Sequence, residues 1–150
     1  MISKKTKYAL KAVLFLTEKY PKGEPVLIAE IAEKESISKK FLESILLELK
    51  NKGLLQSKKG KGGGYLLAKH PNQISFGEVF GIFENPFALL PCLTQAPHRR
   101  CDECRKGSAC GIRIVMQEVY STITSIMNVT TFQEIYDRMG SSRQETMYYI

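Results

Sequence analysis

The fold is decided by one stretch of sequence, Ile37-Ser38-Lys39-Lys40-Phe41-Leu42-Glu43-Ser44-Ile45-Leu46-Leu47-Glu48-Leu49-Lys50. Its apolar residues recur at the spacing of one buried helical stripe: Phe41, Leu42, Ile45, Leu46 and Leu49. Ser38 is a suitable N-cap, because its hydroxyl can accept a hydrogen bond from an amide of the first helical turn. Gly53 suits the left-handed residue that follows a helix end. The stretch therefore predicts an amphipathic helix between Ser38 and Gly53.

The sequence on either side completes a winged helix-turn-helix. Upstream lie a short helix and a turn, marked by Leu27, Ile31, Ala32 and residues 35–37. Downstream, residues 54–57 and 65–67 are predicted to be two strands, joined by the glycine-rich hairpin 58–64 with its three lysines. We therefore expect a mainly α fold with a small β wing, and such folds mostly bind DNA.

The outer face of the predicted helix and the hairpin tip carry small or charged side chains that can reach base edges and phosphates. These candidate DNA-binding residues are Ser38, Lys39, Lys40, Glu43, Ser44, Lys50, Lys58, Lys59 and Lys61. A merely solvated helix face is the simpler alternative. A nucleotide-binding loop is disfavoured, because no Gly-Lys-Ser/Thr follows the glycines and no helix begins after them.

The positive charge lies in the first half of the chain. Residues 1–70 hold 15 Lys and Arg against 7 Asp and Glu, whereas residues 71–150 hold 7 against 8, so that +8 and −1 give the net charge of +7. This asymmetry fits a DNA-contacting module followed by a sensing and assembly module. The sequence shows neither a signal peptide nor an apolar run of 18 residues, so we expect no membrane span and a cytoplasmic location.

Three further helices are predicted outside the winged helix. One spans about residues 4–19, and capping boxes at Ser75 with Glu78 and at Thr131 with Glu134 begin two others. We divide the chain into a DNA-binding domain (1–84), a cysteine-bearing sensor loop (85–110), a dimerisation helix with a final helix (111–140) and a flexible tail (141–150).

A long helix is predicted from Cys110 to about Asn128. Its broad apolar stripe consists of Ile112, Val115, Met116, Val119, Ile123 and Ile126. The stripe could pack against its own domain and still meet a partner helix. Because helix-turn-helix modules usually read two half-sites of a palindromic operator, we expect a homodimer formed through this helix.

Four cysteines, Cys92, Cys101, Cys104 and Cys110, lie within 19 residues before and at the start of the long helix. Cytoplasmic thiols stay reduced, and thiolates suit an iron–sulfur cluster or zinc. The spacing leaves both metals open, since the two-residue gap between Cys101 and Cys104 is also typical of zinc sites. A thiol oxidoreductase would place such a pair in a βαβ unit, and none is apparent.

Four segments of the chain, residues 8–12, 31–32, 37–46 and 53–67, resemble the Rrf-type family of winged-helix regulators, and the resemblance extends to about Met139. Members of that family include an iron–sulfur cluster regulator, a nitric-oxide-sensing repressor, an iron-responsive regulator and a cysteine-metabolism repressor. The resemblance implies a dimeric transcription factor that often holds a 2Fe–2S or 4Fe–4S cluster on three loop cysteines and senses iron, nitric oxide or redox state.

Carried over residue by residue, Cys92 and Cys110 match the first and last family cysteines, and either Cys104 or Cys101 is the middle one. The alternative fourth ligands of relatives, a histidine and an acidic residue, are replaced here by Arg113 and Lys7. The extra cysteine can complete the set. The expected function is therefore cluster-controlled transcriptional regulation. The alternatives are a DNA-binding regulator with structural zinc or no metal, and a protein-interaction adaptor. An enzyme is not expected, because no acid/base pair or nucleophile set appears.

Overall fold

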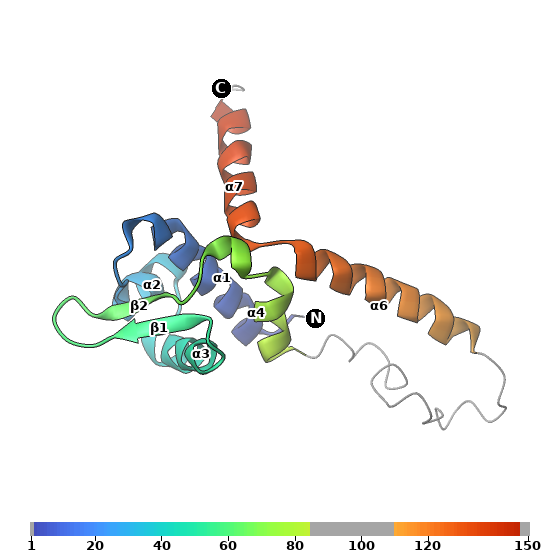
Figure 1. The fold of residues 1–150 in the computed structure, drawn as a ribbon, viewed down its shortest axis with the longest axis horizontal. Coiled ribbons are helices and arrows are strands. Elements are labelled where there is room, and N and C mark those ends of the chain that lie inside the picture. The colour runs from blue at the N-terminus through green and yellow to red at the C-terminus, as the bar shows by residue number, and fades with distance from the viewer. Residues whose placement is uncertain (1, 85–109, 148–150) are drawn as a thin grey trace.

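The predicted winged helix-turn-helix forms the body of the molecule (Figure 1). A long helix, Gly111–Val129, extends away from this body and is called the arm. The structure is a computed structural model that describes residues 2–84 and 110–147, with side chains up to Ser141. Its elements are α1 (Lys4–Lys19), η1 (Tyr20–Lys22), α2 (Ile28–Glu35), α3 (Lys39–Asn51), β1 (Leu55–Lys58), β2 (Gly64–Leu67), η2 (Pro71–Gln73), α4 (Phe76–Phe83), α6 (Gly111–Val129) and α7 (Phe132–Met147).

Helix α1 is the centre of the body and contacts α2, α3, α4 and α7. Its apolar face meets the buried sides of α3 and of the wing in one hydrophobic core. The core residues with no exposed surface are Ala9, Ala12, Val13, Ile31, Leu42, Ile45, Leu46, Leu49, Ile74 and Val79. Burial of this apolar surface is the main force that holds the helix-turn-helix to α1.

Phe41, which we expected on the buried stripe, is instead exposed, and so is Leu27, which marked the predicted short helix. Leu27 is 57% exposed, because it occupies the N-cap of α2 in an extended conformation and so lies outside the helical stripe. Phe41 is 37% exposed, since it lies about 90° around α3 from the centre of the buried face. Its ring meets that of Tyr8 edge to face, with 5.9 Å between centroids. The assignment of Phe41 to the buried stripe was therefore wrong.

The caps follow the prediction only partly. Ser38 is the N-cap of α3, but its side chain makes no capping hydrogen bond. Gly53 adopts the expected left-handed conformation, with a φ of 77°. The hydroxyls of Ser75 and Thr131 accept hydrogen bonds from the amides three residues later, at 3.1 and 3.2 Å. The two glutamates do not complete the capping boxes, because their carboxylates pair with Lys69 and Arg138.

The link between α6 and α7 is fixed in the body. The Phe76 amide donates to the Thr130 carbonyl at 2.8 Å, and the Phe132 amide donates to the Ile74 carbonyl at 3.0 Å. Phe132 itself is only 1% exposed. Gly77 of α4 lies so close to α6 that a Cβ there would be 2.2 Å from the Asn128 Oδ1. The C-terminal end of α6 is thus anchored, and the rest of the helix extends outward (Figure 1).

Helix α7 is longer than expected. We predicted a flexible tail over residues 141–150, but the helix continues to Met147. A single glycine costs a helix only about 1 kcal/mol relative to alanine. Side-chain contacts one turn apart oppose that cost: Gln133 donates to Asp137 at 2.9 Å, and Arg138 pairs with Glu134. None of the described helices combines the length and apolarity needed to cross a membrane.

Glu84, the residue after α4, fastens this helix to the start of α1. Its Oε1 accepts hydrogen bonds from the Thr6 hydroxyl and from the Ser3 amide, both at 2.7 Å. The hydrogen bond from Thr6, followed by those from Ser3, lowers the pKa of Glu84 to about 2. The carboxylate therefore stays ionised at the N-terminus of α1, where negative charge is favourable.

Candidate nucleic-acid interface

The turn between α2 and α3 sets how α3 is presented to solvent. Ser36 ends α2 in the left-handed conformation, with a φ of 54°. The next amide, that of Ile37, donates to the Ala32 carbonyl at 2.9 Å, and the Ile37 side chain is only 5% exposed. The chain thus reverses within a few residues and is held by one buried side chain. This is the helix-turn-helix geometry expected from the sequence.

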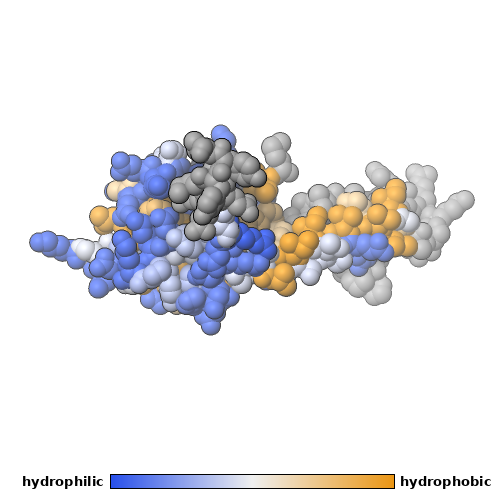
Figure 2. Space-filling model, turned by 90° about the horizontal axis from the view of Figure 1, so that it is seen from above, coloured by the Kyte–Doolittle hydropathy of each residue, from blue (hydrophilic) through white to orange (hydrophobic). Residues whose placement is uncertain are grey.

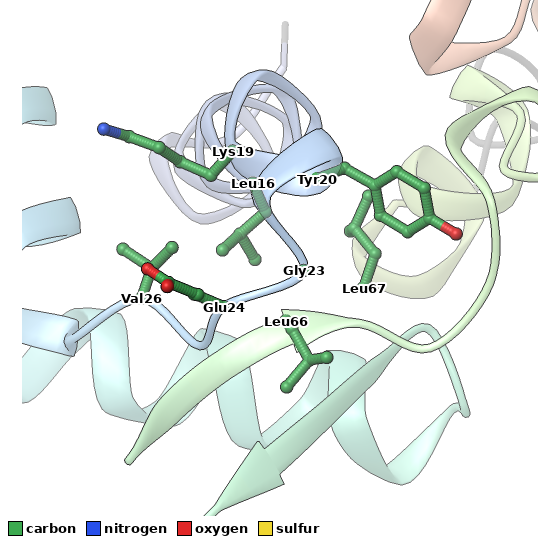
Figure 3. Close-up of a pocket in the computed structure, with 8 residues that line it drawn as sticks. All are labelled: Leu16, Lys19, Tyr20, Gly23, Glu24, Val26, Leu66 and Leu67. Atoms are coloured by element: carbon green, nitrogen blue, oxygen red, sulfur yellow. The ribbon is translucent and has the colours of Figure 1, made fainter. Parts of the chain in front are cut away.

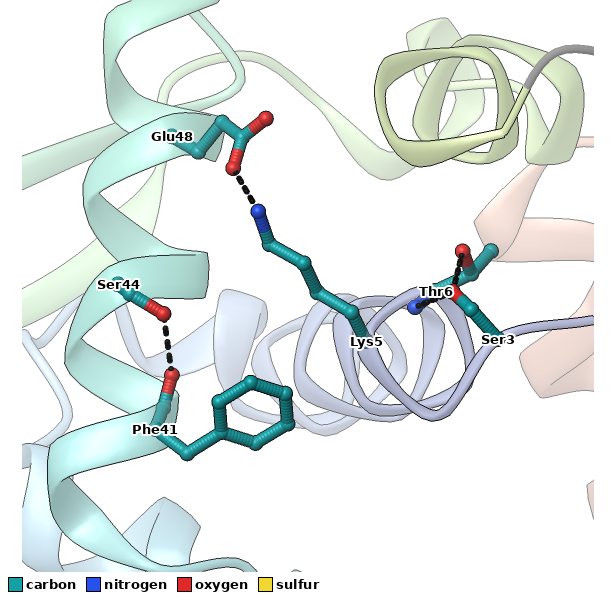
Figure 4. Close-up of polar contacts among 6 residues, drawn as sticks. All are labelled: Ser3, Lys5, Thr6, Phe41, Ser44 and Glu48. Atoms are coloured by element: carbon teal, nitrogen blue, oxygen red, sulfur yellow. Dashed lines mark hydrogen bonds and ion pairs between the residues drawn. The ribbon is translucent and has the colours of Figure 1, made fainter.

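The predicted contact residues on α3 are all exposed. They are Ser38, Lys39, Lys40, Glu43, Ser44 and Lys50. The Ser44 hydroxyl donates to the Phe41 carbonyl at 2.8 Å (Figure 4), so its oxygen remains available as an acceptor. This face can meet a polar, anionic surface without disturbing the core.

Lys5 fixes α3 against α1. Its ammonium group forms an ion pair with Glu48 of α3 (Figure 4) and lies 5.1 Å from the centre of the Phe83 ring of α4. Sequence reasoning did not assign these residues a role, because the contacts join positions far apart in the chain. One lysine thus links the exposed helix to two other helices of the body.

Leu47 also belongs to the outer face of α3, where it is 52% exposed. The sequence pattern alone did not mark Leu47 as a surface residue of interest, because it lies outside the buried stripe and single exposed leucines are common. Helical periodicity could have identified it, since Leu47 lies seven residues after Lys40 and therefore on nearly the same side of the helix.

The wing is a two-stranded antiparallel hairpin in which Leu55 pairs with Leu67 and Lys58 with Gly64. A third segment joins it, because Val26 and Tyr65 exchange two backbone hydrogen bonds of 2.8 Å. Gly64 permits this approach: a Cβ there would lie 2.2 Å from the Val26 carbonyl oxygen. The hairpin tip protrudes from the body (Figure 1) and carries the exposed lysines Lys58, Lys59 and Lys61.

The lysines of α3 and the wing form no ion pairs with the other residues that the structure describes. Several other lysines of the body, Lys5, Lys11, Lys19 and Lys69, form ion pairs with glutamates. Within the described chain, no ion pair is formed by Lys39, Lys40, Lys50, Lys58, Lys59 or Lys61. Exposed unpaired lysines are the groups that neutralise phosphates when a protein binds DNA.

The predicted metal ligands are only partly described. Cys92, Cys101 and Cys104 lie outside the described residues, so their arrangement is left as predicted. Cys110 is half-buried at the N-cap of α6, where its carbonyl accepts from the Ile114 amide at 3.2 Å. Within ranges 2–84 and 110–141, no three His, Cys, Asp or Glu side chains converge on a metal position. The structure thus places Cys110 at the far end of the arm, where α6 begins.

A small cavity of about 30 Å³ lies between the end of α1 and β2 (Figure 3). Its lining is mostly apolar and consists of Leu16, Lys19, Tyr20, Gly23, Glu24, Val26, Leu66 and Leu67. Pockets for organic ligands are roughly ten times larger. This cavity is therefore a packing feature behind the wing, and we assign it no ligand.

Comparison with known proteins gives the family. Residues 2–138 match the model of the Rrf2 family, described as iron-dependent transcriptional regulators. The chain is 38% identical over 137 residues to an HTH-type transcriptional regulator described as rrf2-like from Rhodobacter capsulatus, covering 90% of this chain and 91% of the relative. It is 30% identical over 149 residues to the transcriptional regulator IscR of Pectobacterium atrosepticum, covering 97% and 87%.

The fold is similar to that of CymR, the global cysteine regulator of B. subtilis, with a TM-score of 0.75. The two are 23% identical, and the match covers 92% of this chain and 97% of CymR. The predicted fold class is therefore confirmed. Members of the matched family are transcriptional regulators and not enzymes, which also confirms that prediction. The chain belongs to the Rrf2 family of transcriptional regulators.

Proposed function

We propose that the chain is a homodimeric regulator that binds a palindromic DNA operator with an affinity set by a cysteine-ligated iron–sulfur cluster. One observation carries the DNA-binding part: α3 and the wing present six exposed lysines without ion pairs among the described residues. Such a surface matches the phosphate backbone of DNA, and the helix-turn-helix supplies an element that fits the major groove.

The residues of this surface divide into two roles. Lys39, Lys40 and Lys50 of α3, with Lys58, Lys59 and Lys61 of the wing, are proposed to neutralise phosphates. Ser38, Glu43 and Ser44 are proposed to contact base edges, because acceptor oxygens can meet the amino groups of cytosine and adenine. Reduced thiols and a DNA target both fit action in the cytoplasm.

The proposed homodimer is inferred from helix α6. Five of the six residues of its apolar stripe are exposed, from 71% at Ile112 through 41% at Val119 to 59% at Ile126, and the sixth, Met116, is half-buried. Figure 2 shows hydrophobic surface, in orange, along the arm. A second copy of the same helix would cover the stripe and would place two α3 helices for the two half-sites of a palindrome.

The proposed sensing role is inferred from the four cysteines. Four thiolates within 19 residues fit either an iron–sulfur cluster or zinc, and the family description is iron-dependent. A cluster, when bound, supplies a centre that responds to iron, nitric oxide or oxidation. We assign its ligands to Cys92, Cys110 and one or both of Cys101 and Cys104. Because Cys110 begins α6, its ligation constrains the arm, and a shift of the arm changes the relative position of the two α3 helices.

Salt dependence tests the DNA-binding role. We expect the logarithm of the affinity for duplex DNA to fall against the logarithm of salt concentration with a slope of about −5 or steeper. Lys59→Ala should weaken all sequences alike and make the slope shallower by about 2, because each dimer loses two phosphate contacts. Fluorescence anisotropy over a salt series measures both effects.

Arg138→Ala is the matched control, since it removes one positive charge from α7, on the opposite side of the body from α3 (Figure 1). Its slope should equal that of the unaltered protein. A slope near zero, or no duplex binding at low salt, would contradict DNA binding and leave the adaptor role.

Purification without oxygen tests whether the cysteines hold an iron–sulfur cluster or zinc. We expect brown protein that absorbs in the visible, bleaches with oxygen or nitric oxide, and changes its DNA affinity as it bleaches. Cys92→Ala and Cys110→Ala should each abolish the colour, because each removes a thiolate ligand. The variants Cys101→Ala and Cys104→Ala should show which of these two cysteines is the extra one. Colourless protein with one equivalent of zinc, binding DNA regardless of oxidants, would refute the sensor and support structural zinc.

A further inference from the structure

Leu47 lies in the middle of the outer face of α3. The side chains of Leu42, Ile45, Leu46 and Leu49 are fully buried, and their mean direction is opposite to that of Leu47. At about 100° per residue, Leu47 is only about 20° around the helix from Lys40 and about 60° from Lys50. It therefore points in the same direction as the residues proposed to contact DNA.

A single exposed leucine is common on protein surfaces. The position of Leu47 is what distinguishes it. Its neighbours one turn away are Glu43, Ser44 and Lys50, all exposed and polar, and 52% of its own surface is exposed. The core of α3 is complete without it, since four other apolar residues of the helix are fully buried. Folding of the chain thus does not account for a large apolar side chain at this position.

We propose that Leu47 is a specificity residue that recognises thymine through its 5-methyl group in the major groove. This inference rests on the proposed DNA binding. The thymine methyl is an apolar group that projects into the major groove, and apolar side chains are suited to contact it. Cytosine in its place lacks the methyl group, so the apolar contact with leucine would be lost. Lys40 and Lys50, on either side of Leu47, supply charge that complements the flanking phosphates.

The experiment removes the thymine methyl group and the Leu47 side chain separately. A duplex is first selected from random sequences by the unaltered protein, and each thymine is then replaced in turn by deoxyuridine, which lacks only the methyl group. At one thymine per half-site we expect the affinity to fall about fourfold, from the loss of one buried methyl. Leu47→Ala should lose a similar or larger factor on the thymine duplex and should not distinguish it from the deoxyuridine duplex.

Three controls make the outcome decisive. Lys59→Ala should weaken both duplexes equally, because a phosphate contact does not depend on the base. Thermal unfolding of the Leu47→Ala variant should match that of the unaltered protein, since the side chain is half exposed. Leu47→Gln should select a different base at the same position, with adenine favoured through a bidentate contact.

The proposal is overturned if Leu47→Ala binds the thymine duplex as tightly as the unaltered protein. It is also overturned if every deoxyuridine replacement weakens the variant and the unaltered protein by the same factor. If the unaltered protein selects no duplex at all, the proposed function fails together with this inference, so the two failures are distinguishable.

Discussion

Replacing Val119 with glutamate is expected to convert the proposed dimer to monomers and to lower its affinity for the operator by at least about a hundredfold. Val119 lies in the middle of the exposed stripe of α6, whose other members include Ile112, Val115, Ile123 and Ile126. If a second α6 covers the stripe, two buried glutamates face an apolar interface, and each unpaired buried charge costs several kcal/mol. A monomer reads one half-site only and loses half of the phosphate contacts. Light scattering and a DNA titration measure the two effects.

Ser121→Glu is the matched control for this prediction. It adds the same charge to the same helix, about 160° around the axis from the stripe centre, where Ser121 is exposed. It should leave both the mass and the DNA affinity of the dimer unchanged. A Val119→Glu protein that remains a well-folded dimer would show that the subunits meet elsewhere.

Gly64→Ala is expected to destabilise the protein by about 2–4 kcal/mol. The added Cβ would lie 2.2 Å from the Val26 carbonyl oxygen and 2.6 Å from the Val26 carbonyl carbon, both backbone atoms that a side-chain rotation cannot move. The φ of 155° at Gly64 is also rarely adopted by residues with a side chain. The pairing between Val26 and Tyr65 must therefore open, and the wing must shift. Urea denaturation gives the loss of stability, and a DNA titration should show weaker binding.

Gly81→Ala is the control, because the Cβ added at this glycine meets no other atom. Gly81 lies within α4, is exposed, and has open space where a Cβ would be. Alanine there should stabilise the protein by about 0.5–1 kcal/mol, because glycine is the weaker helix former. Equal stability of the Gly64→Ala variant and the unaltered protein would show that the contact between Val26 and the wing is dispensable.

The parts of the fold that the sequence predicted are those set by local pattern. The stripe of Leu42, Ile45, Leu46 and Leu49 predicted α3 and its buried face, and Gly53 marked its end. Glycines and lysines between two short apolar segments predicted the wing. Such features depend on side chains within a few residues of one another, and periodicity reports them directly.

The features that the sequence did not predict depend on contacts between residues far apart in the chain. The pairing of Val26 with Tyr65 and the ion pair of Lys5 with Glu48 join positions about 40 residues apart. Leu47 was missed because hydrophobicity alone does not tell whether a residue serves the core or a ligand. The roles of the surface residues and of the four cysteines remain predictions, because they concern DNA and metal rather than the packing of the chain.

Among the described residues, the contacts that hold α6 to the body lie at its C-terminal end, which makes the helix a lever. Its pivot is at residues 130–132, and its 19 residues place Cys110 about 28 Å away. A rotation of about 10° at the pivot would carry Cys110 through about 5 Å, and a movement of 1 Å at Cys110 corresponds to only about 2°. A small displacement of Cys110 therefore corresponds to only a very small rotation of the arm. An appreciable turn of the arm requires Cys110 to move by several ångströms, so under the proposed function the expected signal is assembly or loss of the whole ligand set and not a subtle change in bond lengths.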